Sequence, residues 1–277
     1  MNTLADKPVL LTVRGLRAWY AAAQILFDVN LEVRRGEVVA LMGRNGAGKS
    51  TTLKALMGLV PRREGGLSFM GHDLSRADPH RCARLGMGFV PEDRRIFTDL
   101  TVMENLEVGR QPPRRWPDGV AAPEWTPEKL FKLFPNLGEM PQRPGGRMSG
   151  GEQQMLTVAR TLMGNPFLVL LDEPSEGVAP VIVEQMAQTI LELKSQGVSI
   201  LLSEQNMHFA ELVSDRAYVL ETGRVTVSDR ADVLLAERMP GLAVGGDGVE
   251  RHLAILSITT SNSPAPSTQP SLPANSQ

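Results

Sequence analysis

The sequence contains only one cysteine, Cys82, among its 277 residues. A single thiol excludes an internal disulfide and also excludes a metal site built from several cysteines. Cys82 lies in a stretch predicted to be helical, and we expect its thiol to be inert. A chain without disulfides is typical of a reducing compartment, so we expect a cytoplasmic location.

Long apolar runs are absent as well, although hydrophobic residues make up 42% of the chain. The longest runs are much shorter than the roughly 20 residues of a transmembrane helix. The N-terminal segment does not place an apolar stretch after a basic one, so we expect no secretion signal. Attachment to a membrane is therefore expected to come from partner subunits.

The chain also has no excess of positive charge. It contains 29 Lys and Arg residues and 31 Asp and Glu residues, which gives a net charge of −2. Proteins that bind nucleic acids usually carry a basic surface, so we expect no nucleic acid as a partner. The chain shows no internal repeat and no sustained heptad pattern. Its length allows one large domain or two small ones.

A glycine-rich segment carries the strongest local signal. Residues 43–50 match the phosphate-binding pattern G-x-x-x-x-G-K-[ST]. The apolar run 38–42 predicts a buried strand before the segment, and residues 51–57 predict a helix after it. Backbone N–H groups of such a loop, together with the helix N-terminus behind it, bind phosphate groups. We expect nucleotide contacts from Gly43, Arg44, Asn45, Gly46, Ala47, Gly48, Lys49, Ser50 and Thr51.

Two side chains of this loop have distinct expected roles. Lys49 adds a positive charge at the β- and γ-phosphates, and the hydroxyl of Ser50 is placed to ligate Mg²⁺. The loop by itself therefore predicts a bound nucleotide with Mg²⁺; the resemblance given below implies that the nucleotide is ATP.

A second motif lies further along the chain, where residues 148–154 read MSGGEQQ. Ser149 and Glu152 have the spacing of a capping box, which would simply begin the helix that follows. That interpretation leaves the adjacent Gly150 and Gly151 unexplained, because glycine weakens a helix. A serine hydroxyl and glycine N–H groups at a helix N-terminus also suit an anion. Two anion sites and one nucleotide suggest a nucleotide that is shared between two chains.

The apolar run 167–171 predicts a buried strand that ends in Asp172-Glu173-Pro174. Two adjacent carboxylates at the end of such a strand are costly unless a positive charge lies there. Mg²⁺ suits this position, with Asp172 holding the metal through water and Glu173 orienting and deprotonating an attacking water. The alternative is a pair of solvated acids in a turn. Ligands of open α/β sheets bind at strand carboxyl ends, which favours the metal.

Taken together, these motifs make the chain resemble the ATP-binding subunits of ABC transporters over roughly residues 9–240. Within that family it resembles the ATPase subunits of bacterial branched-chain amino-acid uptake systems. The resemblance is carried by the P-loop and by residues 90–97 (VPEDRRIF), 100–106 (LTVMENL), 149–156 (SGGEQQML), 172–180 (DEPSEGVAP) and 204–206 (EQN).

The resemblance implies a role for several residues. Tyr20 would stack on the adenine ring, the alternative being an ordinary tyrosine of a β-sheet. Asp172 would be the acid of the metal site and Glu173 the catalytic base. The segment that would contact the γ-phosphate bound by the opposite subunit consists of Ser149, Gly150, Gly151 and Glu152.

Three positions depart from the commoner ABC pattern and look like markers of the amino-acid uptake subfamily. Glu92 stands in place of Gln, Gln205 in place of His, and Ala179 in place of Asp. We expect Glu92 to face Mg²⁺ or its water, because another carboxylate near phosphates needs a cation. Gln205 would hold the γ-phosphate through an amide that cannot change its charge near neutral pH. His208 falls in the next helix, where we expect a surface or packing role.

The expected fold is the α/β P-loop NTPase fold of ABC ATPases, with a mainly parallel sheet, an antiparallel β subdomain and an inserted helical subdomain at about 95–147. The expected boundaries are 1–8 for an N-terminal extension, 9–244 for the ATPase domain and 245–277 for a C-terminal extension. Residues from about 261 onward contain hardly any large apolar side chains, so we expect disorder there. Residues 111–127 hold five prolines and predict an exposed loop, in which Trp116 and Trp125 serve local packing or a contact surface.

The expected function is that of an ATP-hydrolysing subunit of a bacterial importer, peripheral on the inner face of the membrane. Its partners would be transmembrane permease subunits, a second ATPase subunit of the same or a related kind, and indirectly a substrate-binding protein. A urea or amide importer is an alternative to a branched-chain amino-acid importer. A soluble ABC ATPase would predict two motif copies or a long coiled coil, and a P-loop kinase would not need residues 149–152.

Overall fold

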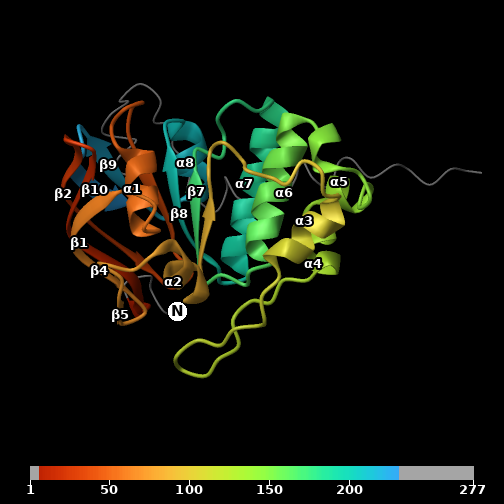
Figure 1. Cartoon of the computed structure of the whole chain (residues 1–277), viewed down its shortest axis with the longest axis horizontal. Helices are drawn as coiled ribbons and strands as arrows, with labels where there is room; N and C mark the ends of the chain where they lie inside the picture. The colour runs from red at the N-terminus through yellow and green to blue at the C-terminus, as the bar shows by residue number, and fades with distance from the viewer. Residues whose placement is uncertain (1–5, 231–277) are drawn as a thin grey trace, which may run out of the picture. The chain divides into compact units, whose positions relative to one another are not determined.

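The structure is a computed structural model that describes residues 6–230, with the backbone alone for residues 227–230. The expected C-terminal boundary at residue 244 and the extension beyond it lie outside the described residues. The described part contains two β-sheets and a group of helices (Figure 1).

One sheet is antiparallel and has four strands in the order β2-β1-β4-β5. Its strands are β1 (Val9–Tyr20), β2 (Ala23–Arg34), β4 (Arg62–Phe69) and β5 (His72–Asp73). The apolar side chains of β1 and β2 alternate with exposed ones, as expected for strands with one buried face. This sheet is the predicted antiparallel β subdomain.

The other sheet has six strands in the order β10-β9-β3-β8-β7-β6. They are β3 (Val38–Met42), β6 (Met87–Val90), β7 (Leu168–Asp172), β8 (Ser199–Glu204), β9 (Arg216–Glu221) and β10 (Arg224–Arg230). All neighbouring pairs are parallel except β9 and β10, which form an antiparallel hairpin. The carboxyl ends of β3, β7 and β8 therefore meet at one edge, where the loops after these strands lie together.

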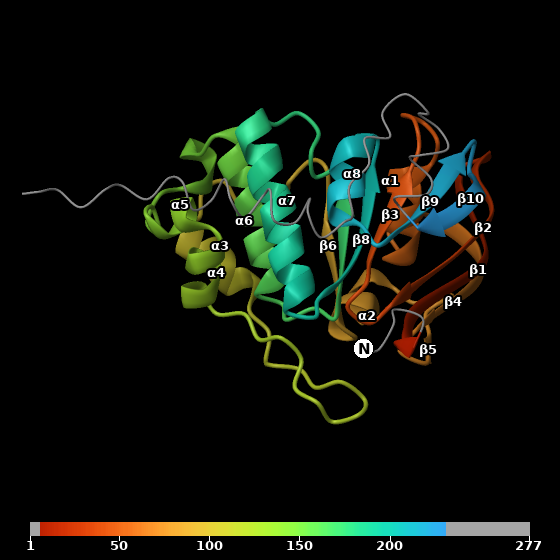
Figure 2. The same ribbon diagram turned by 180° about the vertical axis from the view of Figure 1, so that it is seen from behind.

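The helices are α1 (Lys49–Leu56), α2 (Pro79–Arg84), α3 (Val102–Gly109), α4 (Pro127–Leu133), α5 (Pro135–Gly138), α6 (Gly150–Leu162), α7 (Pro180–Ser195) and α8 (Met207–Val213), with the short 3₁₀ helix η2 (Gly145–Arg147). Figures 1 and 2 show α3 to α7 grouped on the side of the six-stranded sheet that faces away from the antiparallel sheet. In the described part of the chain, no helix combines the length and apolar character needed to span a bilayer.

The central sheet is buried on both faces, which explains why its strands are continuous apolar runs. In β3, Val38 and Ala40 join a core with side chains of α6 and α7. The alternate residues Val39 and Leu41 join a second core with the antiparallel sheet and α1. Packing on both faces holds the strand ends, and the loops that follow them, in fixed relative positions.

The tryptophans of the proline-rich loop are packing residues. Trp116 and Trp125 are only 5% and 3% exposed. The guanidinium carbon of Arg35 lies 4.1 Å from the centre of the Trp116 ring, and the ring of Phe167 lies 4.5 Å from it. Buried rings offer no area to a partner, so the structure decides for local packing and against a contact surface made by these rings. Proline spacing alone could not show this, because the covering residues are distant in sequence.

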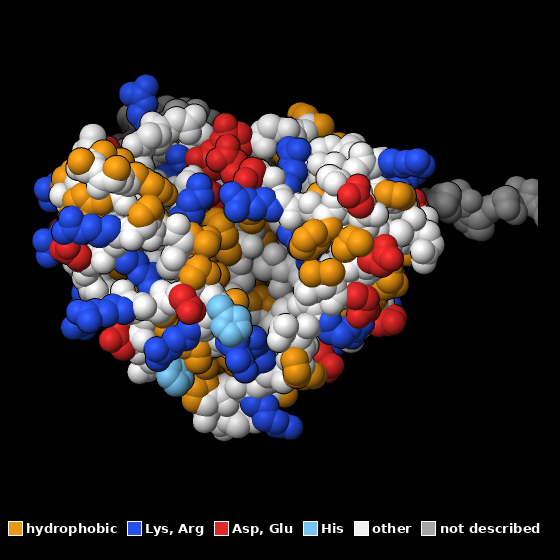
Figure 3. Space-filling view, viewed as in Figure 1, with side chains coloured by type: hydrophobic (Ala, Val, Ile, Leu, Met, Phe, Trp, Pro, Cys, Tyr) orange, Lys and Arg blue, Asp and Glu red, His pale blue; other side chains and the backbone are white. Residues whose placement is uncertain are grey.

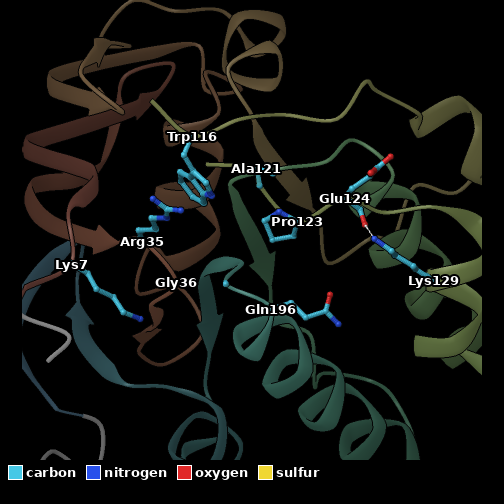
Figure 4. A pocket seen from close by; sticks show the side chains of 11 residues that line it. Lys7, Arg35, Gly36, Trp116, Ala121, Pro123, Glu124, Lys129 and Gln196 are labelled. Carbon is cyan, nitrogen blue, oxygen red and sulfur yellow. Dashed lines mark hydrogen bonds between the residues drawn. The ribbon is translucent and has the colours of Figure 1, made fainter. Parts of the chain in front are cut away.

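The same loop borders a cavity of about 620 Å³ (Figure 4). Lys7, Arg35 and Lys129 contribute positive charges to its lining, and the largely buried Trp116 is also among the lining residues. Gly36, which also lines the cavity, lies two residues before β3. The cavity is therefore at the amino-end edge of the sheet, away from the P-loop that follows the carboxyl end of β3.

Candidate nucleotide-binding and catalytic site

The P-loop occupies the predicted place between β3 and α1. Gly46 and Gly48 have φ angles of 80° and 106°, in the left-handed region that favours glycine. A Cβ atom at Gly43 would lie only 2.4 Å from the backbone oxygen of Leu220, so the β9 strand leaves room for no side chain there. The loop conformation thus depends on glycine for two reasons, backbone conformation and close packing.

Lys49 folds back over this loop. Its Nζ donates hydrogen bonds to the backbone oxygens of Gly43 at 2.8 Å and Arg44 at 3.2 Å. The same Nζ lies 3.0 Å from Oε1 of Glu173, and the two side chains are only 2% and 6% exposed. The structure therefore joins the P-loop lysine and the expected catalytic base in a buried ion pair, which the sequence did not predict.

Asp172 is the last residue of β7 and is 1% exposed. Its Oδ1 accepts a hydrogen bond of 2.8 Å from the hydroxyl of Ser203, whereas its buried Oδ2 has no hydrogen-bond partner among residues 6–230. A buried carboxylate oxygen without a partner is unfavourable unless a cation or a donor arrives. The donor chemistry of this position therefore fits a hard cation such as Mg²⁺.

The remaining ligands of such a cation would have to come from oxygens of several kinds. Within residues 6–230, no three Asp, Glu, His or Cys side chains converge to hold a metal by themselves. Ser50 follows Lys49 in the first turn of α1, as the P-loop prediction requires. Glu92 is exposed in the loop after β6, and its charge contributes to the raised pKa of Glu176. Phosphate oxygens and water would complete the coordination, as is common for Mg²⁺.

Gln205 connects two carboxyl groups. Its Nε2 donates to Oε2 of Glu173 at 2.9 Å and to Oε2 of Glu176 at 3.3 Å. The sequence predicted only that Gln205 would hold the γ-phosphate. The structure adds a direct contact with the expected base, so Gln205 can orient that carboxylate.

The pKa values of Glu173 and Glu176 shift in opposite directions. The hydrogen bond with Glu173, then burial and the negative charges of Glu173 and Glu92, raise the pKa of Glu176 to about 7. Burial acts to raise the pKa of Glu173, but hydrogen bonds from Glu176, Lys49 and Gln205 outweigh it and hold the pKa below its usual value. Glu173 is therefore the ionised member, as a base must be. Figure 3 shows acidic side chains gathered near the top of the view, where the loop between β7 and α7 runs in Figure 1.

Residues 149–152 begin α6 with the predicted capping box. The backbone N–H of Ser149 donates to Glu152 Oε2 at 2.6 Å, and the N–H of Glu152 donates to Ser149 Oγ at 3.3 Å. A Cβ at Gly151 would lie 2.7 Å from Cγ1 of Ile182 in α7, which gives this glycine a packing reason that the sequence did not reveal. Figures 1 and 2 show α1 and α6 apart, with β7 and β8 between them.

Other predicted residues occupy accessible positions. Tyr20 ends β1 and is 38% exposed, so its ring is available for stacking, and contact with adenine stays a prediction. Ala179 precedes α7 without capping it through its side chain. His208 is exposed on α8, consistent with the expected surface role.

Glu204 is a residue of this edge to which the sequence analysis gave no role. It ends β8, is 1% exposed, and accepts three backbone N–H bonds. The signal that would have found it is the one used for Asp172, namely a carboxylate at the end of an apolar strand. Ser203 was missed as well, although its hydroxyl contacts both Asp172 and the backbone of Glu173.

Comparison with known proteins shows the family of this chain. Residues 26–176 match the family model described as ABC transporter. The chain belongs to the ABC transporter family. As an ATP-binding cassette of that family it binds and hydrolyses ATP.

Individual relatives of this ABC ATPase extend the similarity over most of the chain. It is 42% identical over 226 residues to the high-affinity branched-chain amino acid transport ATP-binding protein BraG of Pseudomonas aeruginosa, covering 82% of this chain and 95% of that one. It is 34% identical over 222 residues to the lipopolysaccharide export system ATP-binding protein LptB of Haemophilus influenzae, covering 78% and 88%. A solved structure of an ATP binding subunit of an ABC transporter superposes with a TM-score of 0.68 at 29% identity, covering 89% and 99%.

Proposed function

We propose that this ABC ATPase powers an importer of branched-chain amino acids and that its catalytic base is Glu173. The catalytic assignment is carried by one observation: the Glu173 carboxylate lies 3.0 Å from Nζ of Lys49. The preceding residue, Asp172, has a buried Oδ2 without a hydrogen-bond partner in the described part of the chain. The cargo assignment is supported by the 42% identity to the P. aeruginosa amino-acid transport protein, compared with 34% to the export protein.

The chemistry proposed for these residues is hydrolysis of the γ-phosphate by water. Lys49 and the P-loop N–H groups would hold the β- and γ-phosphates, with Tyr20 on the adenine. Ser50, Asp172 and Glu92 would hold Mg²⁺, which neutralises charge on the phosphates when it is bound. Glu173 would accept the proton of the attacking water. Gln205 would orient Glu173 through the 2.9 Å hydrogen bond and would also meet the γ-phosphate.

The proposed nucleotide site is completed by a second ATPase subunit. Residues 149–152 begin a helix that lies apart from the P-loop helix of the same chain, as Figures 1 and 2 show for α6 and α1. Serine and glycine at a helix N-terminus suit an anion, so this segment would contact the γ-phosphate bound to the partner. Closure of two subunits around ATP would drive permease subunits at the cytoplasmic face of the membrane, and a binding protein would deliver the cargo.

The shared nucleotide is tested with Glu173→Gln, which would trap bound ATP by removing the base. Light scattering after size-exclusion chromatography should show a dimer only with Mg-ATP, and Ser149→Arg should abolish that dimer. A protein that binds ATP but stays monomeric would point to a different ATPase as the partner. Failure to bind ATP would refute the assignment of the P-loop residues.

The cargo is tested separately in cells. Uptake of labelled leucine should fall when the gene is deleted and return when the unaltered protein, but not Glu173→Gln, is supplied. Loss of urea uptake with normal leucine uptake would support the urea alternative instead.

A further inference from the structure

We propose that Glu204 is a positioning residue for ATP hydrolysis, which ties the loop after Glu173 to the loop that carries Gln205. This inference rests on the proposed role of Glu173 as the base. It assigns to Glu204 no contact with nucleotide or metal.

The evidence begins with the two oxygens of one buried carboxylate. Oε1 of Glu204 accepts the backbone N–H of Ser175 at 3.0 Å. Oε2 accepts the backbone N–H groups of Gln205 at 3.0 Å and Asn206 at 3.1 Å. All three donors are backbone N–H groups. Within the described residues 6–230, Glu204 forms no ion pair.

The three N–H groups lie in the two loops that carry Glu173 and Gln205. Ser175 lies two residues after Glu173, so its bond to Glu204 holds the turn in which Glu173 has a left-handed φ of 47°. Gln205 follows Glu204 directly. The hydrogen bond from its backbone N–H to Glu204 fixes the position of its Cα, from which its side chain extends to Glu173. Asn206 also caps α8, because its Oδ1 accepts the N–H of Phe209 at 3.1 Å.

The backbone of Glu204 extends the same connection to the P-loop. Its carbonyl oxygen accepts the N–H of Gly43 at 3.3 Å. The neighbouring Ser203 bonds to Asp172 Oδ1 and to the N–H of Glu173. The end of β8 therefore contacts the loops of both flanking strands, β3 and β7, and the side chain of Glu204 accepts the backbone N–H of Ser175 in the turn after β7.

A carboxylate suits this place because it accepts hydrogen bonds at both ends and donates at neither. The isosteric Glu204→Gln has one oxygen and one NH₂ group. In either orientation its NH₂ would face a backbone N–H, so the bond to Ser175 or the bonds to Gln205 and Asn206 would be lost. The variant therefore loosens one of the two loops while keeping the volume of the side chain.

The expected consequence lies in turnover. Displacement of a catalytic group by about 1 Å can lower a rate about 100-fold. We expect Glu204→Gln to lower kcat by about 10-fold to 100-fold. KM and ATP affinity should stay within about twofold, because Lys49 and the P-loop glycines keep their own contacts and the carbonyl bond to Gly43 remains.

Glu37→Gln is a control at the opposite edge of the sheet. Glu37 is also buried, at 3% exposed, and its Oε2 accepts the backbone N–H of Arg34 at 2.7 Å; unlike Glu204 it also forms an ion pair, in which its Oε1 lies 2.9 Å from Nε of Arg216. It lies just before β3, at the amino-end edge of the sheet. This variant should lower the Tm at least as much as Glu204→Gln does, because it also weakens the ion pair with Arg216, but it should leave kcat within about twofold.

The full chain is assayed for steady-state ATP hydrolysis, ATP affinity by equilibrium fluorescence titration, and Tm. A kcat of Glu204→Gln within twofold of the unaltered protein would overturn the proposal, and so would an equal loss of kcat in Glu37→Gln. Glu173→Gln serves as the third arm. If that variant keeps its turnover, the proposed base is wrong; if it loses turnover while Glu204→Gln does not, only the role of Glu204 fails.

Backbone hydrogen exchange keeps the test independent of variant folding. In the unaltered protein, the amides of Ser175, Gln205 and Asn206 should exchange at least 10-fold more slowly than the exposed amide of Asp118. Exchange of these three amides as fast as that of Asp118 would show that the carboxylate does not hold them, and would also overturn the proposal.

Discussion

Replacing Lys49 by Met should destabilise the protein, because it leaves the buried carboxylate of Glu173 without its positively charged partner. Lys49 and Glu173 lie 3.0 Å apart and are 2% and 6% exposed. Two unit charges at that distance attract by roughly 5–6 kcal/mol at an effective dielectric constant of about 20. Desolvation of both groups cancels much of this attraction, so we expect a net coupling of about 2 kcal/mol.

A double-mutant cycle measures that coupling. We expect Lys49→Met to lower the free energy of unfolding by about 3 kcal/mol, since it leaves the Glu173 carboxylate without its cation. Glu173→Gln should cost about 1 kcal/mol, because Lys49 keeps the carbonyl oxygens of Gly43 and Arg44 as acceptors. The double variant should then be about 2 kcal/mol more stable than the sum of the single effects predicts.

The assay is denaturant unfolding at pH 7 without nucleotide, with the exposed pair Glu107 and Arg110 as the control cycle. That pair is 47% and 48% exposed, so its coupling should be small compared with that of Lys49 and Glu173. Additivity of Lys49→Met and Glu173→Gln within about 0.5 kcal/mol would refute the reasoning. The pKa of Glu173 is held low, so the cost of Lys49→Met should also shrink as the pH falls and Glu173 takes up a proton.

Three further predictions concern the acidity of Glu176 beside the proposed base and the packing of Gly151 and Trp116. The pKa of Glu176 rises from 4.5 to about 7 on folding, so between these pH values the folded protein binds more protons than the unfolded chain. The free energy of unfolding should therefore fall as the pH rises across that interval. Glu176→Gln should remove this fall when unfolding is measured by urea titration at several pH values. Gly151→Ala should lower the free energy of unfolding by about 1–3 kcal/mol, because the added Cβ would clash with Ile182. Ile182→Ala should relieve part of that loss. An undiminished loss in the double variant would contradict the packing explanation. Trp116→Ala should cost about 3 kcal/mol in equilibrium unfolding, whereas a cost below about 1 kcal/mol would mean that the ring is not packed as the structure shows.

Much of the fold was predictable because its signals are contained in short segments. The P-loop, its strand and its helix form one run from Val38 to Leu56, and the structure shows these elements in the predicted order. The β9–β10 hairpin and the capping box of residues 149–152 are equally local. Each depends on residues a few positions apart, which periodicity and turn chemistry can reveal.

The burial of the loop tryptophans could not be predicted in this way. Prolines at 111–127 correctly indicated a loop, yet Trp116 is covered by Arg35 and Phe167, which belong to other parts of the chain. The same holds for Gly151, whose need to be glycine comes from Ile182 on α7. A local pattern shows that a residue type is unusual, but the neighbour that explains it comes from tertiary packing.

The sequence by itself determined which chemical groups are present: a phosphate loop with Lys49, a carboxylate pair at Asp172 and Glu173, and an amide at Gln205. Only the tertiary structure decided how they meet. The strand order places β8 between β3 and β7, so the P-loop, Glu173 and Gln205 share one edge. That order also placed Lys49 beside Glu173 and put Glu204 within reach of Ser175. These contacts join residues far apart in the chain, and the pairing of parallel strands is set by burial of both sheet faces, which no short segment records.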